Sequence, residues 1–286
     1  MRYVDLHVHS NCSDGTFSPS ELVSYALEKN LSAFALTDHD TTAGLSEALA
    51  AAEGTNLEVI PGIEFSTEHH GKDIHIVGLD IAYQSEFFQS QLQNFQDSRE
   101  IRNKKMIAKM QEHHIDISWE EMKNLFGDAV WTRAHFAEYL RQKGYVKNMD
   151  DAFLRFLGDH APCFVPREKV SPSQAVRLIR DTGGIAVLAH PVLYHLTDEK
   201  LGALIQSLKE EGLIGIEAVY STYLGYQEDH MRRLARHYDL CISGGSDFHG
   251  SIKPLIDLGC GRGNLKIPYS FLDSMRDRCA QRHRHF

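Results

Sequence analysis

The stretch "DLHVHSNCSDG", residues 5–15, lies at the start of the chain and points to both its fold and its chemistry. Its apolar and polar residues alternate as they do in a β-strand. In a strand, residues two apart face the same side, so His7 and His9 present their imidazoles to one point. Asp14 follows five residues after His9. The His-x-His pair alone is as typical of two buried structural histidines as of a metal site, so the rest of the chain must decide.

Composition limits the classes of protein that this chain can belong to. With 286 residues, 42% hydrophobic and 24% charged, it is typical of a globular protein with one large domain or a core domain plus an insertion. It has neither an apolar run that could span a bilayer nor a signal-peptide core after Met1, so we expect a cytoplasmic protein without a membrane segment. Five scattered cysteines without a C-x-x-C pair predict reduced thiols. The net charge of −9 argues against a general nucleic-acid-coating surface.

Strand patterns alternate with helix patterns along most of the chain, which favours a mostly parallel sheet or barrel with crossover helices. The first helix has a clear start, with Ser18 as N-cap, Pro19 at the first helical position and Glu21 completing a capping box. Strands are expected within residues 3–9, 31–40, 57–66, 73–82, 185–190, 214–220 and 240–247. Helices are expected within residues 18–30, 41–54, 171–184, 197–212 and 226–238.

Residues 85–165 interrupt this alternation. A long, highly charged helical pattern runs from Ser85 to His114, and two further helical stretches follow it with little strand signal. We therefore predict a helical insertion domain at residues 85–165 and a catalytic barrel formed by residues 1–84 and 166–286. The basic run at residues 276–286 is typical of a solvated terminus.

Histidines and carboxylates stand where the later strands are expected to give way to loops. In barrels and open parallel sheets, ligand and catalytic groups gather at the C-terminal strand ends. Imidazole and carboxylate without thiolate suit Zn, Mn or Fe at a catalytic site with an open position. These candidates exceed what one ion can use, so a cluster of two or three ions bridged by a carboxylate is expected. The candidates are Asp38, His39, Glu64, His75, His190, Asp247 and His249.

Taken in order, these motifs resemble those of the PHP (polymerase and histidinol phosphatase) superfamily. The matching segments between residues 5 and 250 are "DLHVHSNCSDG", "ALTDHD", "GIEFS", "IHIVG", "LAHP" and "SGGSDFHG". The helical insertion resembles that of the stand-alone branch that includes the 3′,5′-nucleotide bisphosphate phosphatase and the 5′-to-3′ exoribonuclease, through "TRAHFAEYL" and "YVKNMDDAFLRFLG". The resemblance implies an α/β fold, a distorted (β/α)7 barrel of PHP type with a helical insertion, and a site for three metals.

The resemblance also implies which residues bind each ion. The first site would comprise His7, His9, Glu64 and Asp247. Glu64 would bridge to a second site with His75 and His190, and the third would comprise Asp14, His39 and His249. Asp38 is expected to orient a ligand rather than bind an ion. We expect two or three divalent ions, manganese first, with zinc or iron as alternatives.

A metal-dependent phosphoesterase is the function that these features favour, because two ions can activate a water and stabilise the attacking and leaving oxygens of a displacement at phosphorus. Glu64, Asp247 and His249 are the expected catalytic residues. We expect hydrolysis of a nucleoside 3′,5′-bisphosphate to the 5′-monophosphate. The alternative is a 5′-to-3′ exonuclease on short 5′-phosphorylated RNA or DNA, and a third possibility is a non-catalytic, metal-stabilised interaction module. The partner would be a small nucleotide or short oligonucleotide, without a stable nucleic-acid complex.

The substrate phosphate also requires cations from the protein. Arg133 is the first candidate, because arginine forms bidentate bonds with phosphate, although an ordinary salt bridge at a helix start is the competing interpretation. Tyr220 could stack on a base or simply pack in the core. The weaker candidates for phosphate contacts are His135, Arg167 and Lys253, and the candidates for a general acid are His160 and His195.

Overall fold

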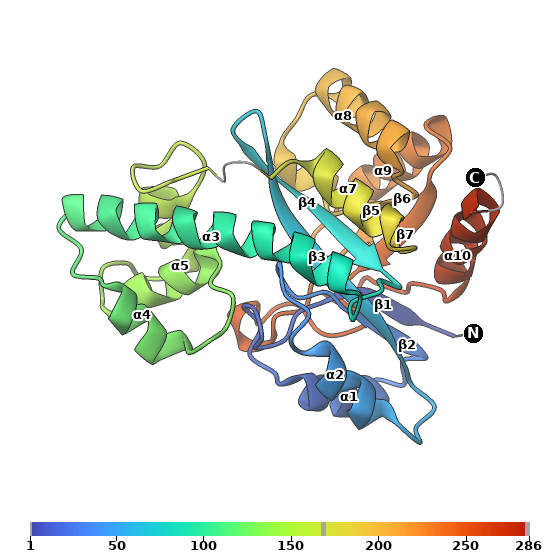
Figure 1. Ribbon diagram of the computed structural model, residues 1–286, viewed down its shortest axis with the longest axis horizontal. Coiled ribbons are helices and arrows are strands. Elements are labelled where there is room, and N and C mark those ends of the chain that lie inside the picture. Colours follow the sequence, from blue (N-terminus) through green and yellow to red (C-terminus); the bar gives the residue numbers. More distant parts are fainter. Residues whose placement is uncertain (1, 167–169, 284–286) are drawn as a thin grey trace.

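Figure 1 shows the computed structural model of the protein, which describes residues 2–166 and 170–283. The strands are β1 (Val4–Val8), β2 (Ala33–Leu36), β3 (Glu58–His69), β4 (Lys72–Leu79), β5 (Ile185–Leu188), β6 (Gly215–Tyr220) and β7 (Cys241–Gly245). The α-helices are α1 (Pro19–Glu28), α2 (Leu45–Ala52), α3 (Glu86–Glu112), α4 (Trp119–Phe126), α5 (Arg133–Gln142), α6 (Met149–Ala152), α7 (Pro172–Asp181), α8 (Asp198–Glu211), α9 (Gly225–His237) and α10 (Ser270–His283). Shorter helical turns are η1 (Phe153–Leu157), η2 (Pro191–Tyr194) and η3 (Gly250–Ile252).

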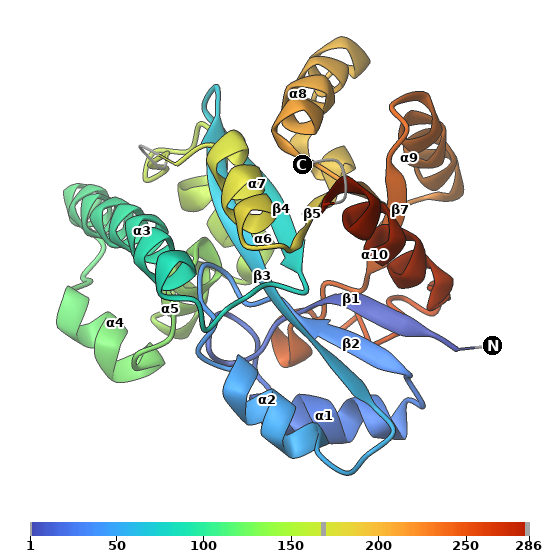
Figure 2. The ribbon, with the colours of Figure 1, turned by 45° about the vertical axis from the view of Figure 1, so that its right-hand side comes forward.

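The strands form a single seven-stranded sheet in which each strand pairs with the next along the chain. The end of the sheet returns beside its beginning, where Asp247 N donates to His7 O at 2.9 Å. His9 N donates in turn to Phe248 O at 3.0 Å. These bonds nearly close the sheet into a barrel, and helices lie around its outside (Figure 2). The predicted α/β fold with a distorted barrel is confirmed.

One strand runs against the expected direction. A two-residue hairpin joins β3 to β4, and His70 and Gly71 both have positive φ, 52° and 78°, as in a type I′ turn. As a result β4 is antiparallel to β3 and to β5, whereas the other neighbouring pairs are parallel. The expectation that Glu64 and His75 follow strand ends is therefore wrong. Both lie within strands, and the reversed β4 brings its first half to the end of the barrel where the parallel strands finish.

Side-chain alternation divides the buried residues of the sheet into two layers. In β2, Ala33 and Ala35 join the cluster inside the barrel, while Phe34 and Leu36 join the cluster between the sheet and the outer helices. Successive side chains of a strand point to opposite faces, so the alternation that predicted these strands also determines which residues face the interior of the barrel.

The C-terminal helix α10 closes the base of the barrel. Leu272, Met275 and Cys279 of this helix belong to the interior cluster. Arg276 also donates to Asp80 and Glu58 at 2.7 and 2.8 Å. The expectation of a solvated end is therefore wrong for Arg276, which is half-buried, and for Cys279, which is buried, whereas Asp277, Ala280 and Gln281 are exposed as expected.

The insertion has a buried cluster of its own, formed by residues between 106 and 165. The long helix α3 spans from the barrel into this cluster (Figure 1). Phe88 and Phe95 of α3 pack with the outer cluster of the barrel, whereas Met106 and Met110 pack within the insertion. One continuous helix therefore belongs to both cores. The domain boundaries at residues 85 and 165 stay a prediction.

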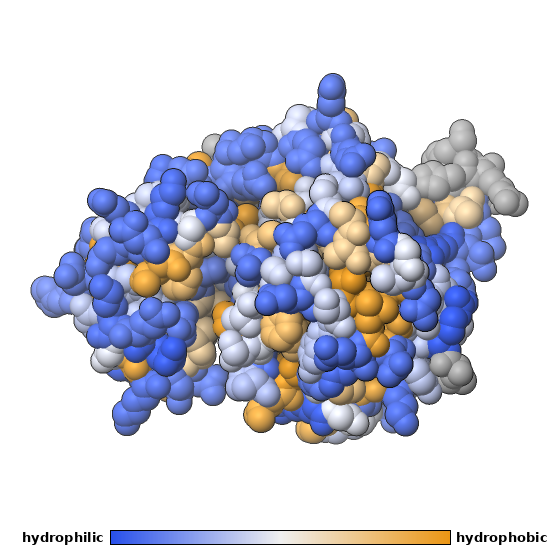
Figure 3. Space-filling view, turned by 90° about the horizontal axis from the view of Figure 1, so that it is seen from below, coloured by the Kyte–Doolittle hydropathy of each residue, from blue (hydrophilic) through white to orange (hydrophobic). Residues whose placement is uncertain are grey.

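The surface seen from below is largely hydrophilic, and hydrophobic residues gather mainly in its right-hand half (Figure 3). Polar and charged residues thus cover much of this face, in keeping with the 24% of charged residues in the sequence. Within residues 2–166 and 170–283, no helix is both long enough and apolar enough to cross a membrane.

Closure of the barrel requires a glycine at position 245. A Cβ atom on Gly245 would lie 2.2 Å from the Cβ atom of His7 on the neighbouring strand. We predict that Gly245→Ala lowers the free energy of unfolding by about 1–3 kcal/mol, the usual cost of overpacking. Urea denaturation would measure this loss. Gly225→Ala is the matched control, because a Cβ there meets no atom within 4 Å; equal stability of the two variants would contradict the prediction.

Candidate metal centre

Strand alternation places polar side chains above the apolar interior of the barrel. Ile60, Gly62 and Glu64 lie on one face of β3, and Ile60 belongs to the interior cluster. The same alternation in β4 sets His75 on the face of Val77, which is also interior. The apolar residues therefore fill one end of the barrel, and imidazoles and carboxylates meet at the other.

Glu64 lies at the centre of this cluster and is only 1% exposed. Its Oε1 atom is 2.8 Å from His75 Nδ1 and 3.0 Å from His190 Nε2. Its Oε2 atom is 3.1 Å from the Nε2 atoms of both His7 and His9. Oε2 also lies 3.2 Å from His39 Nδ1. The two oxygens of one carboxylate thus face different sets of histidines, which is the arrangement of a bridging ligand.

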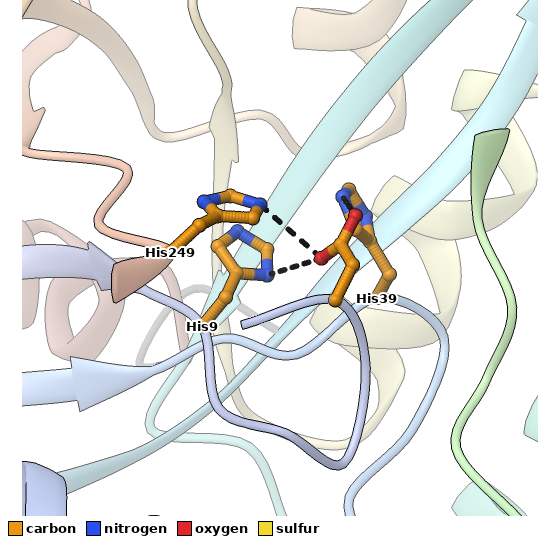
Figure 4. Close-up of side chains that lie close together, drawn as sticks. His9, His39 and His249 are labelled. Carbon is orange, nitrogen blue, oxygen red and sulfur yellow. Dashed lines mark ion pairs between the residues drawn. The ribbon is translucent and has the colours of Figure 1, made fainter. Parts of the chain in front are cut away.

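A second group forms around Asp14. The rings of His9, His39 and His249 converge from separate parts of the chain (Figure 4). Asp14 Oδ1 is 3.2 Å from His249 Nε2 and 3.9 Å from His9 Nδ1, and Asp14 Oδ2 is 3.9 Å from His39 Nε2. All four side chains are buried. The loop after β1 therefore folds back so that its aspartate reaches the same end of the barrel.

Asp247 divides its oxygens between the histidines and the edge of the site. Its Oδ1 atom is 3.3 Å from His249 Nδ1 and 3.4 Å from His9 Nε2. Its Oδ2 atom accepts hydrogen bonds from the Tyr220 hydroxyl at 2.5 Å and from Lys253 Nζ at 2.6 Å. Burial alone would raise the pKa of Asp247, but the Lys253 ammonium and the histidines lower it well below its usual range. Asp247 is therefore a carboxylate, and Tyr220, whose pKa burial raises, remains a donor.

The nine side chains predicted as metal ligands all fall in four overlapping groups, within each of which the ligand atoms lie within 4.8 Å of one another. The groups are His9, Asp14, His39 and His249; His7, Glu64 and His190; His7, His9 and Asp247; and His39, Glu64 and His75. They differ from the predicted sets in placing His9 with Asp14 and His39 with His75. The assignment of each ligand to an ion stays a prediction.

The donor atoms fit divalent transition-metal ions. Among the described residues, His7 Nε2, His9 Nε2 and Asp14 Oδ1 are buried without a hydrogen-bond partner. Buried polar atoms rarely lack a partner, so a ligand that accepts their lone pairs is expected there. The cluster offers nitrogen and oxygen without thiolate, which suits Mn, Fe or Zn.

Glu217, a residue that the sequence analysis missed, orients two of the histidines. Its Oε1 atom accepts from His7 Nδ1 at 3.1 Å, and its Oε2 atom accepts from His190 N at 2.7 Å. A carboxylate bonded to one ring nitrogen leaves the lone pair of the other free for a metal. The sequence offered one signal for the role of Glu217. It is the single acid within the apolar strand pattern "GIEAVY", and a buried charge needs a partner.

Asp38 lies outside the four groups and holds the loop that carries Asp14. It accepts from Ser10 N at 2.8 Å and from the hydroxyls of Ser10 and Ser13, both at 2.6 Å. This placement supports the orienting role that the sequence suggested.

Two residues of the cluster have unusual backbone conformations. Asp247 has a φ of 56° and His190 a φ of 26°, in a region that residues other than glycine seldom adopt. A hydrogen bond fixes the backbone N–H of each residue. Asp247 N donates to His7 O, and His190 N donates to Glu217 Oε2. Strain of this kind is typical of functional sites.

The cluster opens into a cavity of about 390 Å³, the catalytic cavity, which the barrel and the insertion line together. Arg133, Lys253 and Tyr220 line it, and their contact with a substrate stays a prediction. Arg99 and Arg102 line it too, although the sequence analysis had placed them only on a charged helix. Arginines of the insertion and the histidine and carboxylate cluster therefore line the same cavity.

Arg133 makes ion pairs at the start of α5 and also lines the catalytic cavity. Its position is therefore compatible with both interpretations of the sequence, an ordinary salt bridge and a phosphate contact. Its Nη2 atom is 2.8 Å from Asp73 Oδ2, and its Nη1 atom is 3.4 Å from Asp159 Oδ1. The side chain is 19% exposed. A phosphate contact from Arg133 stays a prediction.

His135 does not line the catalytic cavity but the cavity beside it. Its Nδ1 atom accepts from Thr132 N at 3.0 Å, and it also bonds the backbone of Ser13. Burial lowers the pKa of His135 to about 4, so the ring is neutral at neutral pH. This placement does not support the expected phosphate contact.

Three weaker candidates from the sequence gain no support. His160 and His195 do not line the catalytic cavity. Arg167 lies outside the described residues.

Comparison with known proteins shows that residues 5–164 match the PHP domain. The chain belongs to the PHP family. A 5′-3′ exoribonuclease of Haemophilus influenzae is 39% identical over 245 residues, which cover 86% of this chain and 89% of that protein. A 3′,5′-nucleoside bisphosphate phosphatase of Chromobacterium violaceum is 34% identical over 253 residues, covering 87% and 88%.

Solved structures share this fold over nearly the whole chain. A Bifidobacterium adolescentis protein described as a metal-dependent phosphoesterase superposes with a TM-score of 0.84, at 27% identity over 97% of this chain and 96% of that one. A Chromobacterium violaceum protein described as an amidohydrolase, with bound sulfate and no metal, gives a TM-score of 0.85 at 30% identity, over 95% and 96%. This PHP protein is therefore a metal-dependent hydrolase of phosphate esters, and the alternative of a non-catalytic module is not favoured.

The insertion of this PHP protein contacts the candidate metal centre directly. Thr132, the N-cap of α5, donates from Oγ1 to Asp14 Oδ2 at 2.6 Å. Because loss of such a partner usually weakens metal binding by about 10- to 100-fold, we predict that Thr132→Val lowers affinity for one ion per chain by that factor. Calorimetric titration of the metal-free protein with Mn²⁺, together with metal content after gel filtration, would measure it.

Two controls separate this effect from loss of a helix cap. Thr132→Ser retains the hydroxyl and should bind metal as the wild type does. Thr197→Val removes the N-cap of α8, a residue that belongs to none of the four groups and does not line the catalytic cavity, and should cost about 1 kcal/mol of stability without changing metal binding. Identical metal titrations for Thr132→Val and Thr197→Val would refute a role of Thr132 in holding Asp14.

The neutral His135 predicts a pH effect on stability. Its pKa of about 4 in the folded protein lies below the ordinary 6.5, so the unfolded chain takes up a proton first as the pH falls. The stability that His135 provides is complete above pH 6.5 and is lost as the pH falls towards 4, by up to about 3 kcal/mol at 1.4 kcal/mol per pH unit. His135→Gln, which preserves a capping-box acceptor, should reduce this loss.

Urea denaturation of both proteins at pH 7 and pH 5, without metal, would measure the difference. Parallel pH dependence of the wild type and His135→Gln would show that this ring does not titrate as described.

Proposed function

We propose that this PHP protein hydrolyses the 3′-phosphate ester of nucleotides that also carry a 5′-phosphate, with nucleoside 3′,5′-bisphosphates as small-molecule substrates. The observation that carries the proposal is the catalytic cavity itself. It is lined both by residues of the candidate metal cluster and by Arg99, Arg102 and Arg133. A cavity that combines a metal cluster with several arginines suits a substrate that carries two phosphates.

The size of the cavity and the relatives support this substrate class. At about 390 Å³ the cavity falls within the range of small-molecule sites. One relative is named a 3′,5′-nucleoside bisphosphate phosphatase, and others are named 5′-3′ exoribonucleases. A bisphosphatase and an exonuclease that releases 5′-monophosphates would break the same bond between phosphorus and O3′ of a nucleotide. They differ only in what else the phosphorus carries.

The residues of the chain have distinct tasks in this hydrolysis. Divalent ions, when bound, would activate the attacking water and neutralise charge on the phosphate. Asp247 is ionised and held by Tyr220 and Lys253, so its carboxylate can accept a hydrogen bond from that water and orient it. Arg133 would bind the 5′-phosphate, which fixes the position of the 3′-phosphate at the cluster.

Manganese is the ion that we propose, with zinc or iron as alternatives, because the donors are imidazoles and carboxylates. A cytoplasmic location is consistent with the five cysteines, all of which are free.

Substrate comparison would test the proposal. The Mn²⁺-loaded protein should convert adenosine 3′,5′-bisphosphate to AMP and leave AMP intact. Arg133→Ala should raise KM for the bisphosphate by about 10- to 100-fold, the effect of losing a charge-assisted hydrogen bond, without changing metal content. Arg155→Ala is the control, because Arg155 pairs with Asp151 and does not line the catalytic cavity. Phosphate release from AMP at the rate of the bisphosphate, or an Arg133→Ala enzyme equal to Arg155→Ala, would oppose this proposal.

A further inference from the structure

Arg99 is a buried arginine that the insertion places against the barrel. It lies on α3 and is only 4% exposed. Its Nε and Nη2 atoms donate to Asp40 Oδ2 at 2.8 and 2.6 Å. The same Nη2 atom donates to Ser66 Oγ at 2.7 Å. Arg99 therefore binds a carboxylate and a hydroxyl of the barrel at the same time.

The two partners of Arg99 each lie close in sequence to a predicted metal ligand. Asp40 directly follows His39, and Ser66 lies two residues after Glu64 on β3. Asp40 is fully buried, its Oδ1 atom accepts from Ser66 N at 3.1 Å, and its N–H donates to Glu64 O at 3.0 Å. A buried carboxylate is costly without a cation. Arg99 therefore stabilises the segment that carries His39.

The contacts of the His39 ring indicate which nitrogen can bind an ion. Its Nδ1 atom is 3.2 Å from Ser66 Oγ and 3.2 Å from Glu64 Oε2. A carboxylate oxygen only accepts hydrogen bonds, so a neutral ring carries its proton on Nδ1. The lone pair is then on Nε2, which lies 3.9 Å from Asp14 Oδ2. His39 thus presents its free nitrogen to the group around Asp14.

The hydroxyl of Ser66 becomes more important when the cluster is occupied. Ions bound to Glu64 would compete with His39 for the oxygens of this carboxylate. Ser66 Oγ would then remain as an acceptor for the Nδ1 proton. A partner of this kind fixes both the tautomer and the orientation of a metal-binding histidine. Because Arg99 donates to Ser66 Oγ, only this one oxygen separates its guanidinium from the ring of His39.

We propose that Arg99 is a positioning residue of the metal centre, which acts through Ser66 to keep the Nε2 atom of His39 available to an ion. Thr132 of the insertion already bonds Asp14, a member of the same group. The insertion therefore holds two ligands of this group, and one ion of the cluster binds tightly only when α3 is docked on the barrel. This inference rests on the candidate metal centre and not on the identity of the substrate.

Removal of the Ser66 hydroxyl is the first test. Ser66→Ala should weaken the binding of one Mn²⁺ per chain by about 10- to 100-fold, the usual effect of losing such a partner. Calorimetric titration of the metal-free protein would measure it. Thr67→Val is the matched control. It removes a buried hydroxyl that bonds Ile74 O, one residue further along β3, and Thr67 belongs to none of the four groups. This control should bind metal as the wild type does.

The second test asks whether Arg99 acts through Ser66. Arg99→Lys keeps a charge for Asp40, but a single ammonium cannot reproduce the contacts of two guanidinium nitrogens. It should weaken the same ion by about tenfold or more. In the double variant with Ser66→Ala the loss should be smaller than the product of the two single losses, because both changes remove one shared contact.

The control for Arg99→Lys is Arg276→Lys. Arg276 pairs with Asp80 and Glu58 at the base of the barrel and does not line the catalytic cavity, so this change should leave metal binding unaltered. Urea denaturation without metal would show which variants fold. If Arg99→Lys does not fold, Arg99→Met combined with Asp40→Asn replaces it in the comparison, since this pair leaves no unpaired buried charge.

The tautomer of His39 is a third readout, and it needs neither metal nor substrate. Two-bond ¹⁵N–¹H correlation spectra of the metal-free protein should show the proton of the neutral ring on Nδ1. Comparison with His39→Gln would assign the signals. A proton on Nε2 would overturn the inference.

The metal titrations can overturn it as well. Equal titrations for Ser66→Ala and Thr67→Val would show that Ser66 does not support an ion. Losses that multiply in the double variant would show that Arg99 does not act through Ser66. Either result would leave the proposed substrate unaffected, whereas a wild-type protein that binds no divalent ion would also contradict the proposed function.

Discussion

The interaction on which the structure depends is the contact of one buried carboxylate, Glu64, with histidines on both of its oxygens. Many groups that water would normally solvate are enclosed here at one end of a barrel. Their desolvation is costly unless each lone pair meets a proton or a cation. The surrounding carboxylates satisfy part of this demand, as Glu217 does for His7, and divalent ions would satisfy the remainder. The rest of the fold can be understood as the means of holding these groups together.

The insertion contributes to the same arrangement from outside the barrel. Helix α3 is continuous from one core to the other, so bending it would disturb both. Arg99 on this helix donates to Asp40 at 2.6 Å and to Ser66 at 2.7 Å, and both of these residues belong to the barrel. Thr132 adds a bond to Asp14 itself. These links make the insertion a fixed wall of the catalytic cavity in this structure.

Much of the fold and of the cluster could be predicted because the relevant signals are local. The capping box at Ser18 and Glu21 starts α1 as expected, and the period of two assigned the faces of the strands. The histidine and carboxylate motifs lie close to strand ends and were visible as sequence.

Features that depend on packing could not be predicted in this way. The burial that makes His135 neutral and the contacts of Tyr220 with Asp247 arise between elements distant in sequence. The direction of β4 depends on the two-residue turn at His70 and Gly71. The sequence analysis did not recognise this turn as a hairpin, because it lies within a run of polar residues. In α10 the apolar positions are few, and only the open base of the barrel shows why they are buried.

Closure between β1 and β7 has a consequence for the order in which the site can form. The cluster draws on the first and last strands, since His7 and His9 meet Asp247 and His249. During synthesis the early ligands leave the ribosome long before their partners, and closing so long a loop carries an entropic cost that only complete strand pairing repays. A nascent chain therefore cannot assemble the full set of ligands until His249 has been made. High-affinity metal loading becomes an event that follows the synthesis of β7.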